Sequence, residues 1–235
     1  MKKVINQWNN AAKAYSESQR TAPNNLTNWQ ILTELVGEAK GKVVLDAGCG
    51  DGFFSNKLKK LGAKVYACDG AKAFVEMAKS EFDGIEFSVE DLTKQLSYRD
   101  NYFDIVISSL VLMDIDNIDT FFGEANRILK MNGKLIFSIM HPCFFLPDWV
   151  KDQNGKKLYK KVETYLQEKT ELLHFWGETT HYHRTLSDYS KRLKKAGFAI
   201  SEIRESPEDK QFFKNLPEQQ QRVPLFVAIE CIKCR

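Results

Sequence analysis

Short apolar segments alternate along this chain with segments in which apolar side chains recur every three or four residues. The first kind predicts buried strands and the second predicts amphipathic helices. Their alternation indicates an α/β fold, with a parallel sheet between two layers of helices. The predicted strands are Val43–Asp46, Val65–Asp69, Ile85–Val89, Tyr102–Leu110, Lys134–Met140, Phe198–Ile203 and Leu225–Cys231. The predicted helices that follow the first strand cover about 54–61, 71–82, 118–130 and 185–195.

Two regions depart from this alternation. Residues 4–36 have apolar side chains at helical spacing and predict helices before the first strand. Residues 143–182 are rich in aromatic side chains and contain Asn154-Gly155, a hairpin-turn signal. We therefore expect one domain over residues 1–235, with an N-terminal helical segment at about 1–38 and an insertion at about 143–182. Polar residues from about Glu205 to Arg222 predict a long loop.

A glycine-rich turn follows the first strand. The strand ends at Asp46, and Gly48, Gly50 and Gly52 alternate with other residues, among them Asp51. Glycine allows a tight turn and lets a ligand approach backbone N–H groups. In a doubly wound sheet this turn is where nucleotides bind. The two carboxylates would repel a pyrophosphate, so they favour a cationic ligand over NAD.

The segment from Val44 to Gly52 resembles motif I of the class I S-adenosylmethionine (SAM) dependent methyltransferases, in which hydrophobic residues precede Asp-x-Gly-x-Gly-x-Gly. The resemblance, to the small-molecule, methyltransferase-domain 11/25-like group, covers nearly the whole chain, and its specific motifs lie between residues 44 and 110. It implies a Rossmann-like, doubly wound sheet of seven strands, mostly parallel, with the last strand antiparallel. It also implies SAM as cofactor and S-adenosylhomocysteine as product.

The resemblance implies a set of SAM-binding residues as well. Asp69 ends the second strand, roughly twenty residues after the glycine turn, and is expected to bind the ribose hydroxyls. Asp91, with Glu90 as the second choice, is expected to bind the adenine amino group. Tyr15 belongs to helices that either form a lid over the cofactor or simply pack on the domain. The expected set is Tyr15, Asp46, Gly48, Cys49, Gly50, Asp69, Gly70, Asp91, Leu92 and Ser108.

The residues after the fourth strand bear on the acceptor. Ser108-Ser109-Leu110 stands where methyltransferases of nucleic-acid bases often carry a Pro-Pro-aromatic turn, which favours a small-molecule acceptor. Many small-molecule members have a histidine shortly after this strand, whereas this chain has Met113 and Asp114. The candidate catalytic bases are therefore His141, His183 and His181.

The aromatic insertion is expected to cover the acceptor site, although simple packing on the sheet is an alternative. Its candidate substrate residues are Trp149, Tyr182 and Arg184, and Arg184 is able to hold an acidic group bidentately. Histidines that only bond to the backbone are as plausible as catalytic ones. No metal site is expected, because no carboxylate or cysteine completes a familiar spacing with them.

Composition adds few restrictions. A chain of 235 residues with 43% hydrophobic and 28% charged residues is ordinary for a globular protein. The net charge of +3 is too small to indicate nucleic acid or membrane binding. No secretory signal or membrane span is evident, and five scattered cysteines favour a reduced, cytoplasmic protein. Monomer and homodimer remain open.

Four functions remain in competition. A SAM-dependent methyltransferase of a small molecule, acting by in-line displacement, fits the motifs best. An RNA or protein methyltransferase would require a basic surface around the cleft. An NAD-dependent oxidoreductase is disfavoured by Asp46 and Asp51, and a SAM-binding module without activity is the fourth hypothesis.

Overall fold

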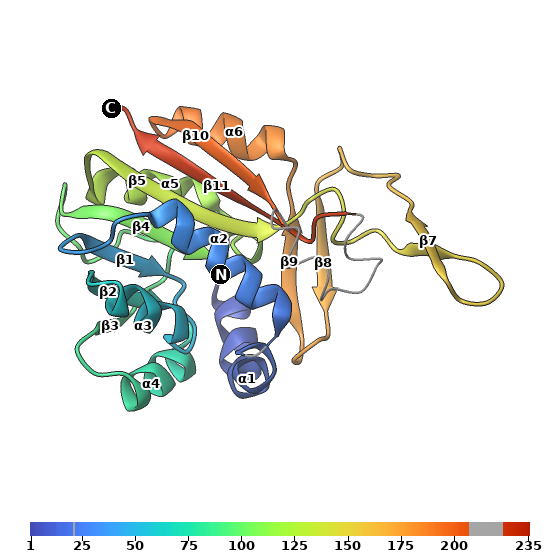
Figure 1. The fold of residues 1–235 in the computed structure, drawn as a ribbon, viewed down its shortest axis with the longest axis horizontal. Coiled ribbons are helices and arrows are strands. Elements are labelled where there is room, and N and C mark those ends of the chain that lie inside the picture. The colour runs from blue at the N-terminus through green and yellow to red at the C-terminus, as the bar shows by residue number, and fades with distance from the viewer. Residues whose placement is uncertain (21, 207–222) are drawn as a thin grey trace.

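The computed structural model describes residues 1–20, 22–206 and 223–235, and a twisted sheet forms its centre (Figure 1). The expected loop after Glu205 lies mostly at 207–222, outside the described residues. The strands of the central sheet are β1 (Val43–Ala47), β2 (Lys64–Asp69), β3 (Glu86–Val89), β4 (Phe103–Ser109), β5 (Leu129–Met140), β10 (Phe198–Glu205) and β11 (Phe226–Lys233).

The strand order is β10-β11-β5-β4-β1-β2-β3. Strands β1 to β5 pair in parallel, whereas β11 runs antiparallel to both β5 and β10. The predicted seven-stranded, mostly parallel sheet with an antiparallel last strand is therefore confirmed. The order reverses at β1, which pairs with β2 on one side and β4 on the other. Such a reversal opens a crevice at the carboxyl ends of the strands, which is where α/β proteins bind ligands.

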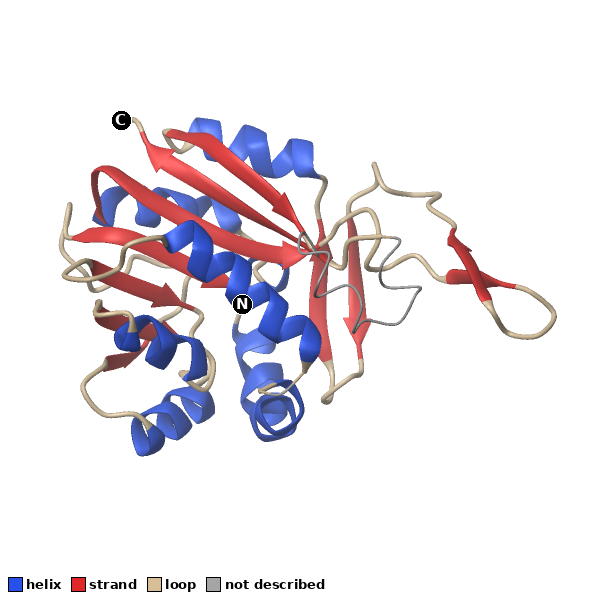
Figure 2. Ribbon diagram, in the orientation of Figure 1, coloured by secondary structure: helices blue, strands red, loops and turns tan. Residues whose placement is uncertain are grey.

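Helices cover both faces of the sheet (Figure 2). One face carries α2 (Pro23–Val36), α3 (Phe53–Lys60) and α4 (Lys72–Glu81), and the other carries α5 (Ile118–Ile128) and α6 (Leu186–Lys195). Side chains of a strand alternate between the faces, so Val44 packs with α2 and α3 while Leu45 packs with α5. This double burial explains the nearly continuous apolar character of β1 and β4.

The region between β5 and α6 forms two hairpins. Strands β6 (Trp149–Lys151) and β7 (Lys157–Lys160) make the first, and β8 (Lys169–Leu173) and β9 (Thr179–His183) make the second. The first hairpin extends away from the sheet, as Figure 1 shows. Its turn has Gly155 at positive φ, and the Asp152 carboxylate accepts the N–H groups of Asn154 and Lys156, each at 2.9 Å. The hairpin predicted at Asn154-Gly155 is confirmed.

The N-terminal helix α1 (Lys2–Gln19) packs against α4 and β9, so it joins the sheet edge to the second hairpin. Gln7 bonds to Glu178 and Thr180 at 2.7 and 2.8 Å. Trp176 packs its ring against both Trp8 and Tyr15, with centroids 6.2 and 4.9 Å apart. The N-terminal segment and the insertion, far apart in the sequence, are therefore in direct contact.

One element boundary differs from the sequence prediction. The helix expected over 118–130 ends at Ile128, and β5 already begins at Leu129. The Ile128 carbonyl accepts the Tyr102 N–H at 2.7 Å, and Leu129 pairs with Phe103, so the neighbouring strand captures the end of the helix. Asn132 then turns the chain with a positive φ of 62°.

Candidate functional site

The glycine turn between β1 and α3 folds over the end of β2. The backbone N–H groups of Gly48 and Cys49 donate to the Cys68 carbonyl at 2.7 and 2.9 Å. Gly48 has a φ of +82°, and a Cβ at this position would lie 2.4 Å from a methyl group of Val111. At Gly50, also at positive φ, nothing lies within 4 Å of such a Cβ. Glycine is thus required at the first position by packing, and at the second it leaves open space beside the backbone.

Asp69, the last residue of β2, is fixed by this turn. One carboxylate oxygen accepts the Gly50 N–H at 3.0 Å, and the other accepts the Ala71 N–H at 2.8 Å. Burial raises the pKa of Asp69 to about 6, which the two backbone bonds oppose. The carboxylate is therefore held in one orientation, with further lone pairs available for a ligand's hydroxyl groups.

The other two acids of the turn have different environments. Asp46 is buried, and one of its oxygens accepts the Ser55 hydroxyl at 2.6 Å. The second oxygen has no hydrogen-bond partner among the described residues, and burial raises the pKa of Asp46 to about 7. Asp51 instead pairs with Arg20, which follows α1, at 2.6 Å. Asp51 was expected to favour a cationic ligand. In the structure its negative charge is already paired with the guanidinium of Arg20.

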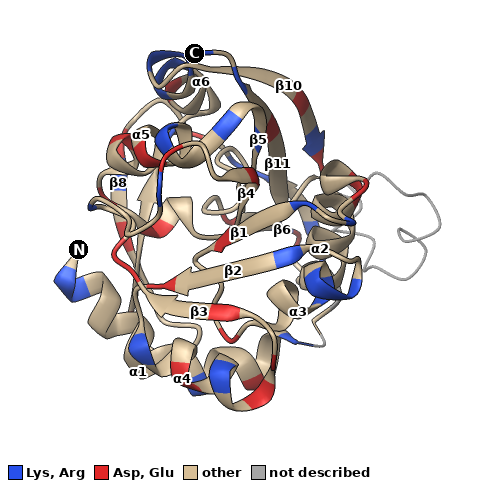
Figure 3. Cartoon of the chain, turned by 90° about the vertical axis from the view of Figure 1, so that its left-hand side faces the viewer, with Lys and Arg blue, Asp and Glu red and all other residues tan. Residues whose placement is uncertain are grey.

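A cavity opens next to this turn, and we name it the loop cavity. Its walls come from the ends of β1, β2, β3 and β4 together with α1, and red segments at the ends of β1 and β2 mark the acidic edge in Figure 3. Asp46, Cys49 and Ser108 do not line it: Asp46 and Cys49 are buried near the turn, and Ser108 bonds to the Ala47 carbonyl at 2.8 Å. The expected residues that line it are Tyr15, Gly48, Gly50, Asp69, Gly70, Asp91 and Leu92.

Other residues of the loop cavity were missed by sequence reasoning. From α1 come Trp8, which crosses the Tyr15 ring edge-on at 5.5 Å, and the apolar side chains of Val4 and Ile5. From the segment after β4 come Val111 and Asp114. The helical spacing of Trp8 and Tyr15 predicts that both side chains lie on one packed face of a helix. The sequence does not show what this face covers, and only the folded structure places it over the ends of the strands.

A second cavity, the insertion cavity, adjoins the first. It shares Trp8, Tyr15, Leu110 and Asp114 with the loop cavity. The rest of its lining is mainly apolar and comes from the end of β5, the insertion and the start of β11. These further residues include Met113, Met140, Phe145, Leu173, Phe175, Trp176, Thr179, His181, Leu225 and Phe226. Two neighbouring spaces that share wall residues, one with acidic groups at the glycine turn and one beneath the insertion, suit two ligands held side by side.

Of the three candidate histidines, His181 lines the insertion cavity. Its ring packs against Phe145 at 5.3 Å between centroids, and burial lowers its pKa to about 4. His141 is bonded on both ring nitrogens, to Glu205 at 2.7 Å and to the Cys143 N–H at 3.2 Å. His183 bonds through Nε2 to the Tyr165 carbonyl at 2.7 Å. Neither His141 nor His183 lines the loop cavity or the insertion cavity.

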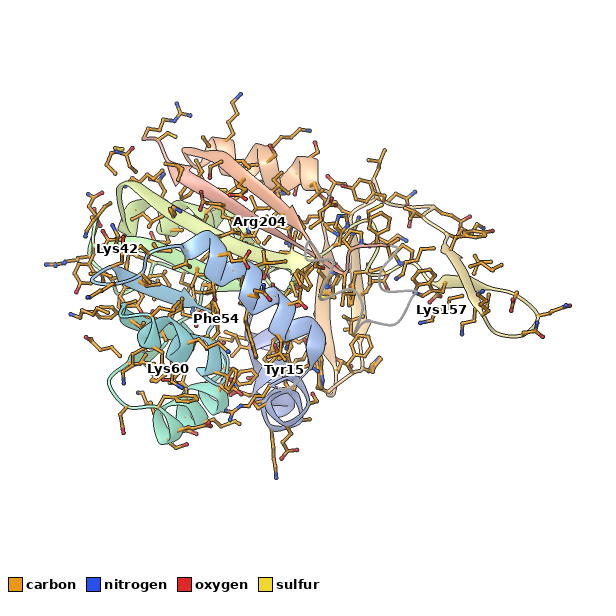
Figure 4. The ribbon with its side chains drawn as sticks, viewed as in Figure 1. Tyr15, Lys42, Phe54, Lys60, Lys157 and Arg204 are labelled. Atoms are coloured by element: carbon orange, nitrogen blue, oxygen red, sulfur yellow. The ribbon has the colours of Figure 1, made fainter. Side chains whose placement is uncertain are left out.

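The three candidate substrate residues lie outside both cavities. Trp149 is on β6, and Figure 4 labels its neighbour Lys157 on the extended hairpin, well away from Tyr15. Tyr182 is half-buried on β9, with the Arg184 guanidinium over its ring at 5.4 Å. The guanidinium of Arg184 is buried and donates to the carbonyls of Leu112, Ile115 and Asp116 at 3.2, 2.6 and 2.7 Å. Its hydrogen bonds therefore connect the insertion to the segment after β4, and an acidic substrate group would have to compete with three carbonyls.

The described residues contain no group of three or more His, Cys, Asp or Glu side chains arranged to hold a metal ion. None of the described helices is long and apolar enough to cross a membrane. Polar side chains among the described residues that line the loop cavity or the insertion cavity include Asp69, Asp91, Asp114 and His181.

Known proteins share this sequence and fold. A family model described as "Methyltransferase domain" matches residues 45–137. A malonyl-[acyl-carrier protein] O-methyltransferase of Buchnera aphidicola is 33% identical over 165 residues, 66% of this chain and 63% of that relative. A Listeria monocytogenes structure assigned to the SAM-dependent methyltransferases is 29% identical, with a TM-score of 0.79 over 89% of this chain and 98% of that one. A SAM-dependent methyltransferase structure from Mesorhizobium loti is 25% identical, with a TM-score of 0.80 over 90% and 100%.

Proposed function

Because this chain belongs to the class I SAM-dependent methyltransferases, with SAM as its cofactor, we propose that it transfers the methyl group of SAM to a small-molecule acceptor by in-line displacement. The observation that carries this proposal is the pair of neighbouring cavities. The loop cavity is lined by seven of the ten residues expected to bind the cofactor, and the insertion cavity adjoins it through Trp8, Tyr15 and Asp114. A concave, largely apolar space fits a small molecule better than a polymer.

The residues of the loop cavity fit SAM. Asp69 is fixed with free lone pairs for the ribose hydroxyls, and Asp91 lies at the end of β3 for the adenine amino group. The glycine turn leaves room beside Gly50 for close approach. The unpartnered buried oxygen of Asp46 makes this edge favourable for a positive charge. When bound, SAM supplies an electrophilic methyl group on a sulfonium.

The domain organisation follows from this assignment. We propose a single domain over residues 1–235, in which the N-terminal helices form a lid and residues 143–182 cap the acceptor. The contacts of Trp176 with Trp8 and Tyr15 support a lid and cap that close together. Closing the site excludes water and holds the acceptor near the methyl group, which is what a displacement reaction needs.

Among the three candidate histidines, we assign the contact with the acceptor to His181. Its ring faces the insertion cavity, whereas His141 and His183 are bonded to Glu205 and to the Tyr165 carbonyl. A neutral imidazole is able to donate or accept one hydrogen bond to the acceptor. His181→Gln should raise KM about two- to tenfold, since a neutral hydrogen bond contributes roughly 0.5–1.5 kcal/mol. His183→Gln is the matched control, and an equal KM change in both variants would contradict the assignment.

We also propose that the enzyme works in the cytoplasm. All five cysteines are free thiols, and Cys49, Cys68 and Cys231 are buried, as expected in a reducing compartment. RNA and protein acceptors remain the competing class. They would have to reach a cavity that α1 and the insertion cover from two sides.

Ligand binding tests the central proposal. SAM and S-adenosylhomocysteine should raise the melting temperature, because a ligand that binds only the folded state stabilises it, and NAD should not. Incubation with SAM and a metabolite extract, followed by mass spectrometry, should then show a product heavier by one methyl group. A shift with NAD but none with SAM would reject the cofactor. Methylation confined to RNA or protein would reject the small-molecule acceptor.

A further inference from the structure

Asp114 is a buried carboxylic acid at the junction of the two cavities. It ends the short 3-10 helix η1 (Leu112–Asp114) after β4, and its exposed fraction is 8%. It lines both the loop cavity and the insertion cavity. Its carboxyl group therefore faces the place where a cofactor and an acceptor would meet.

The structure holds Asp114 from two directions. The three carbonyl bonds of Arg184 fix the backbone immediately before and after it, at Leu112, Ile115 and Asp116. From α1, the side chain of Trp8 lines the same two cavities as Asp114 and opposes the rise in the pKa of this acid. An acid supported in this way is pre-organised for a ligand and does not need to rearrange when one binds.

The surroundings of Asp114 favour a cation. Among the described residues that line the insertion cavity, Asp114 is the one carboxylic acid, and no lysine or arginine accompanies it. The titratable neighbours there are Tyr15 and His181. Aromatic rings of Trp8, Phe175 and Trp176 line the same space, and their faces attract positive charge. Burial raises the pKa of Asp114, and the charge of Asp69 adds to this rise, so a bound cation would relieve an unfavourable charge.

We propose that the methyl acceptor is an amine with an apolar body, and that Asp114 binds its ammonium form and takes its proton as the catalytic base. This inference rests on the proposed function, and it names the acceptor class of the same site. His181 lines only the insertion cavity, whereas Asp114 also reaches the loop cavity, so Asp114 is the group closer to the cofactor side. His181 lies on β9, which packs against η1, so it contacts the amine or its body from the insertion cavity.

The step balances as follows. The ammonium nitrogen gives one proton to the Asp114 carboxylate and regains its lone pair. The amine nitrogen then forms a bond to the methyl carbon, and the bond between that carbon and sulfur breaks with its electron pair remaining on sulfur. The methylated nitrogen carries the positive charge that the sulfonium loses, and Asp114 returns its proton to solvent when the product leaves.

Binding of three matched probes tests this inference without turnover. The protein, saturated with S-adenosylhomocysteine, is titrated calorimetrically with 2-phenylethylamine, 2-phenylethanol and phenylacetate, which share one body and differ in charge. The amine should bind about 10- to 100-fold more tightly than the alcohol, as expected for a hydrogen bond to a charged group. Phenylacetate should bind more weakly than the alcohol. Asp114→Asn should remove the preference for the amine, while Asp119→Asn, on the outer helix α5, should retain it.

The outcomes separate this inference from the proposed function. If wild-type protein binds S-adenosylhomocysteine but shows no preference for the amine, the acceptor class is wrong and the methyltransferase assignment stands. If Asp114→Asn loses affinity for S-adenosylhomocysteine and keeps the amine preference, Asp114 serves the cofactor and the inference is overturned. Should that variant not fold, mass spectrometry of wild-type products decides, because methyl ethers or esters without N-methyl products would overturn it.

Discussion

The edge around the glycine turn, residues 46–71, and the insertion, residues 143–182, are built by different rules. At the edge, the Asp69 carboxylate bonds to Gly50 of the adjacent turn and to Ala71 two residues later, although Asp51 pairs with Arg20 after α1. In the insertion, His181 faces a cavity whose other walls come from α1, η1 and β11. A site of the first kind can be recognised in one stretch of sequence. A site of the second kind exists only after distant segments have folded together.

The exposure of side chains to solvent also differs between the glycine edge and the insertion. The insertion leaves large apolar side chains at the surface, with exposed fractions of 83% for Leu166 and 64% for Phe175. At the glycine edge, Asp46, Cys49 and Asp51 are all buried. The acids and the cysteine of the turn are therefore constrained, whereas the insertion keeps freedom to vary where it does not line the cavity, as at Leu166. This is the arrangement expected when one cofactor is retained and acceptors differ.

The largest effect should come from Arg184, which follows the insertion and bonds to the segment after β4. Arg184→Ala removes the donor of two buried carbonyl groups, those of Leu112 and Ile115, and of the partly buried carbonyl of Asp116, and each unsatisfied buried polar group costs about 1–3 kcal/mol. Because water will reach some of these carbonyls, we expect the free energy of unfolding to fall by about 3 kcal/mol. Urea denaturation followed by circular dichroism measures it.

Arg192→Ala provides the control. Arg192 forms two ion pairs on the surface of α6, and exposed pairs contribute about 1 kcal/mol or less. Arg184→Lys should lie between the two variants, because lysine keeps the charge but lacks the planar fork of donors. A loss below 1 kcal/mol for Arg184→Ala would mean that the insertion and η1 are not coupled through this side chain.

A smaller effect, on the affinity for SAM, should distinguish two aspartates that each cap a turn of the backbone. Asp69 and Asp152 each accept two backbone N–H groups, one at the edge and one in the β6–β7 hairpin. Asp69→Ala should weaken SAM binding about 10- to 100-fold, since hydrogen bonds to a charged group contribute roughly 1.5–3 kcal/mol. Asp152→Ala should leave the affinity unchanged. Calorimetric titration of both folded variants checks this, and equal affinities would remove Asp69 from the cofactor site.

The comparison also explains what the sequence could predict. The alternation of apolar runs and helical patterns determined the sheet, because strands buried on both faces must be apolar throughout. Asp69 and Asp91 were expected at the site because each stands at or shortly after the carboxyl end of its strand, and both line the loop cavity. Asp114 was noted only as standing where a histidine was expected. Its role becomes visible when Trp8, from the other end of the sequence, closes over it.

Two expected substrate residues, Arg184 and Trp149, line neither the loop cavity nor the insertion cavity, and the reasons are physical. Arg184 has the chemistry to hold a substrate acid, but three carbonyls of the segment after β4 satisfy it first. Trp149 is aromatic and lies within the insertion, yet it belongs to a hairpin that extends away from the cavity. Residue type alone cannot tell a side chain that faces a cavity from one that packs nearby, since both are aromatic or charged and both are partly buried.

The pH dependence of stability should have opposite signs in the two regions. In the folded state burial holds the pKa of Asp46 at about 7, above its ordinary 3.8, so the folded protein retains a proton that the unfolded chain has released. Stability from this group is therefore lost as pH rises from about 4 to about 7. His181 has a folded pKa of about 4, below its ordinary 6.5, so its contribution is lost as pH falls from about 6.5 to about 4.

Melting temperatures across this range test both signs, with a change of about 2–4 °C for each kcal/mol in a chain of this size. Asp46→Asn keeps a partner for Ser55 and should flatten the fall of the melting temperature between pH 5 and pH 8. His181→Gln should flatten the fall toward pH 4, whereas His174→Gln, at an exposed position of the same insertion, should follow the wild type. SAM should also flatten the fall of the melting temperature between pH 5 and pH 8, because a cation at the edge lowers the pKa of the buried acids. An unchanged pH profile in Asp46→Asn would mean that this carboxylate is already paired in solution, and that the edge does not need a positive ligand.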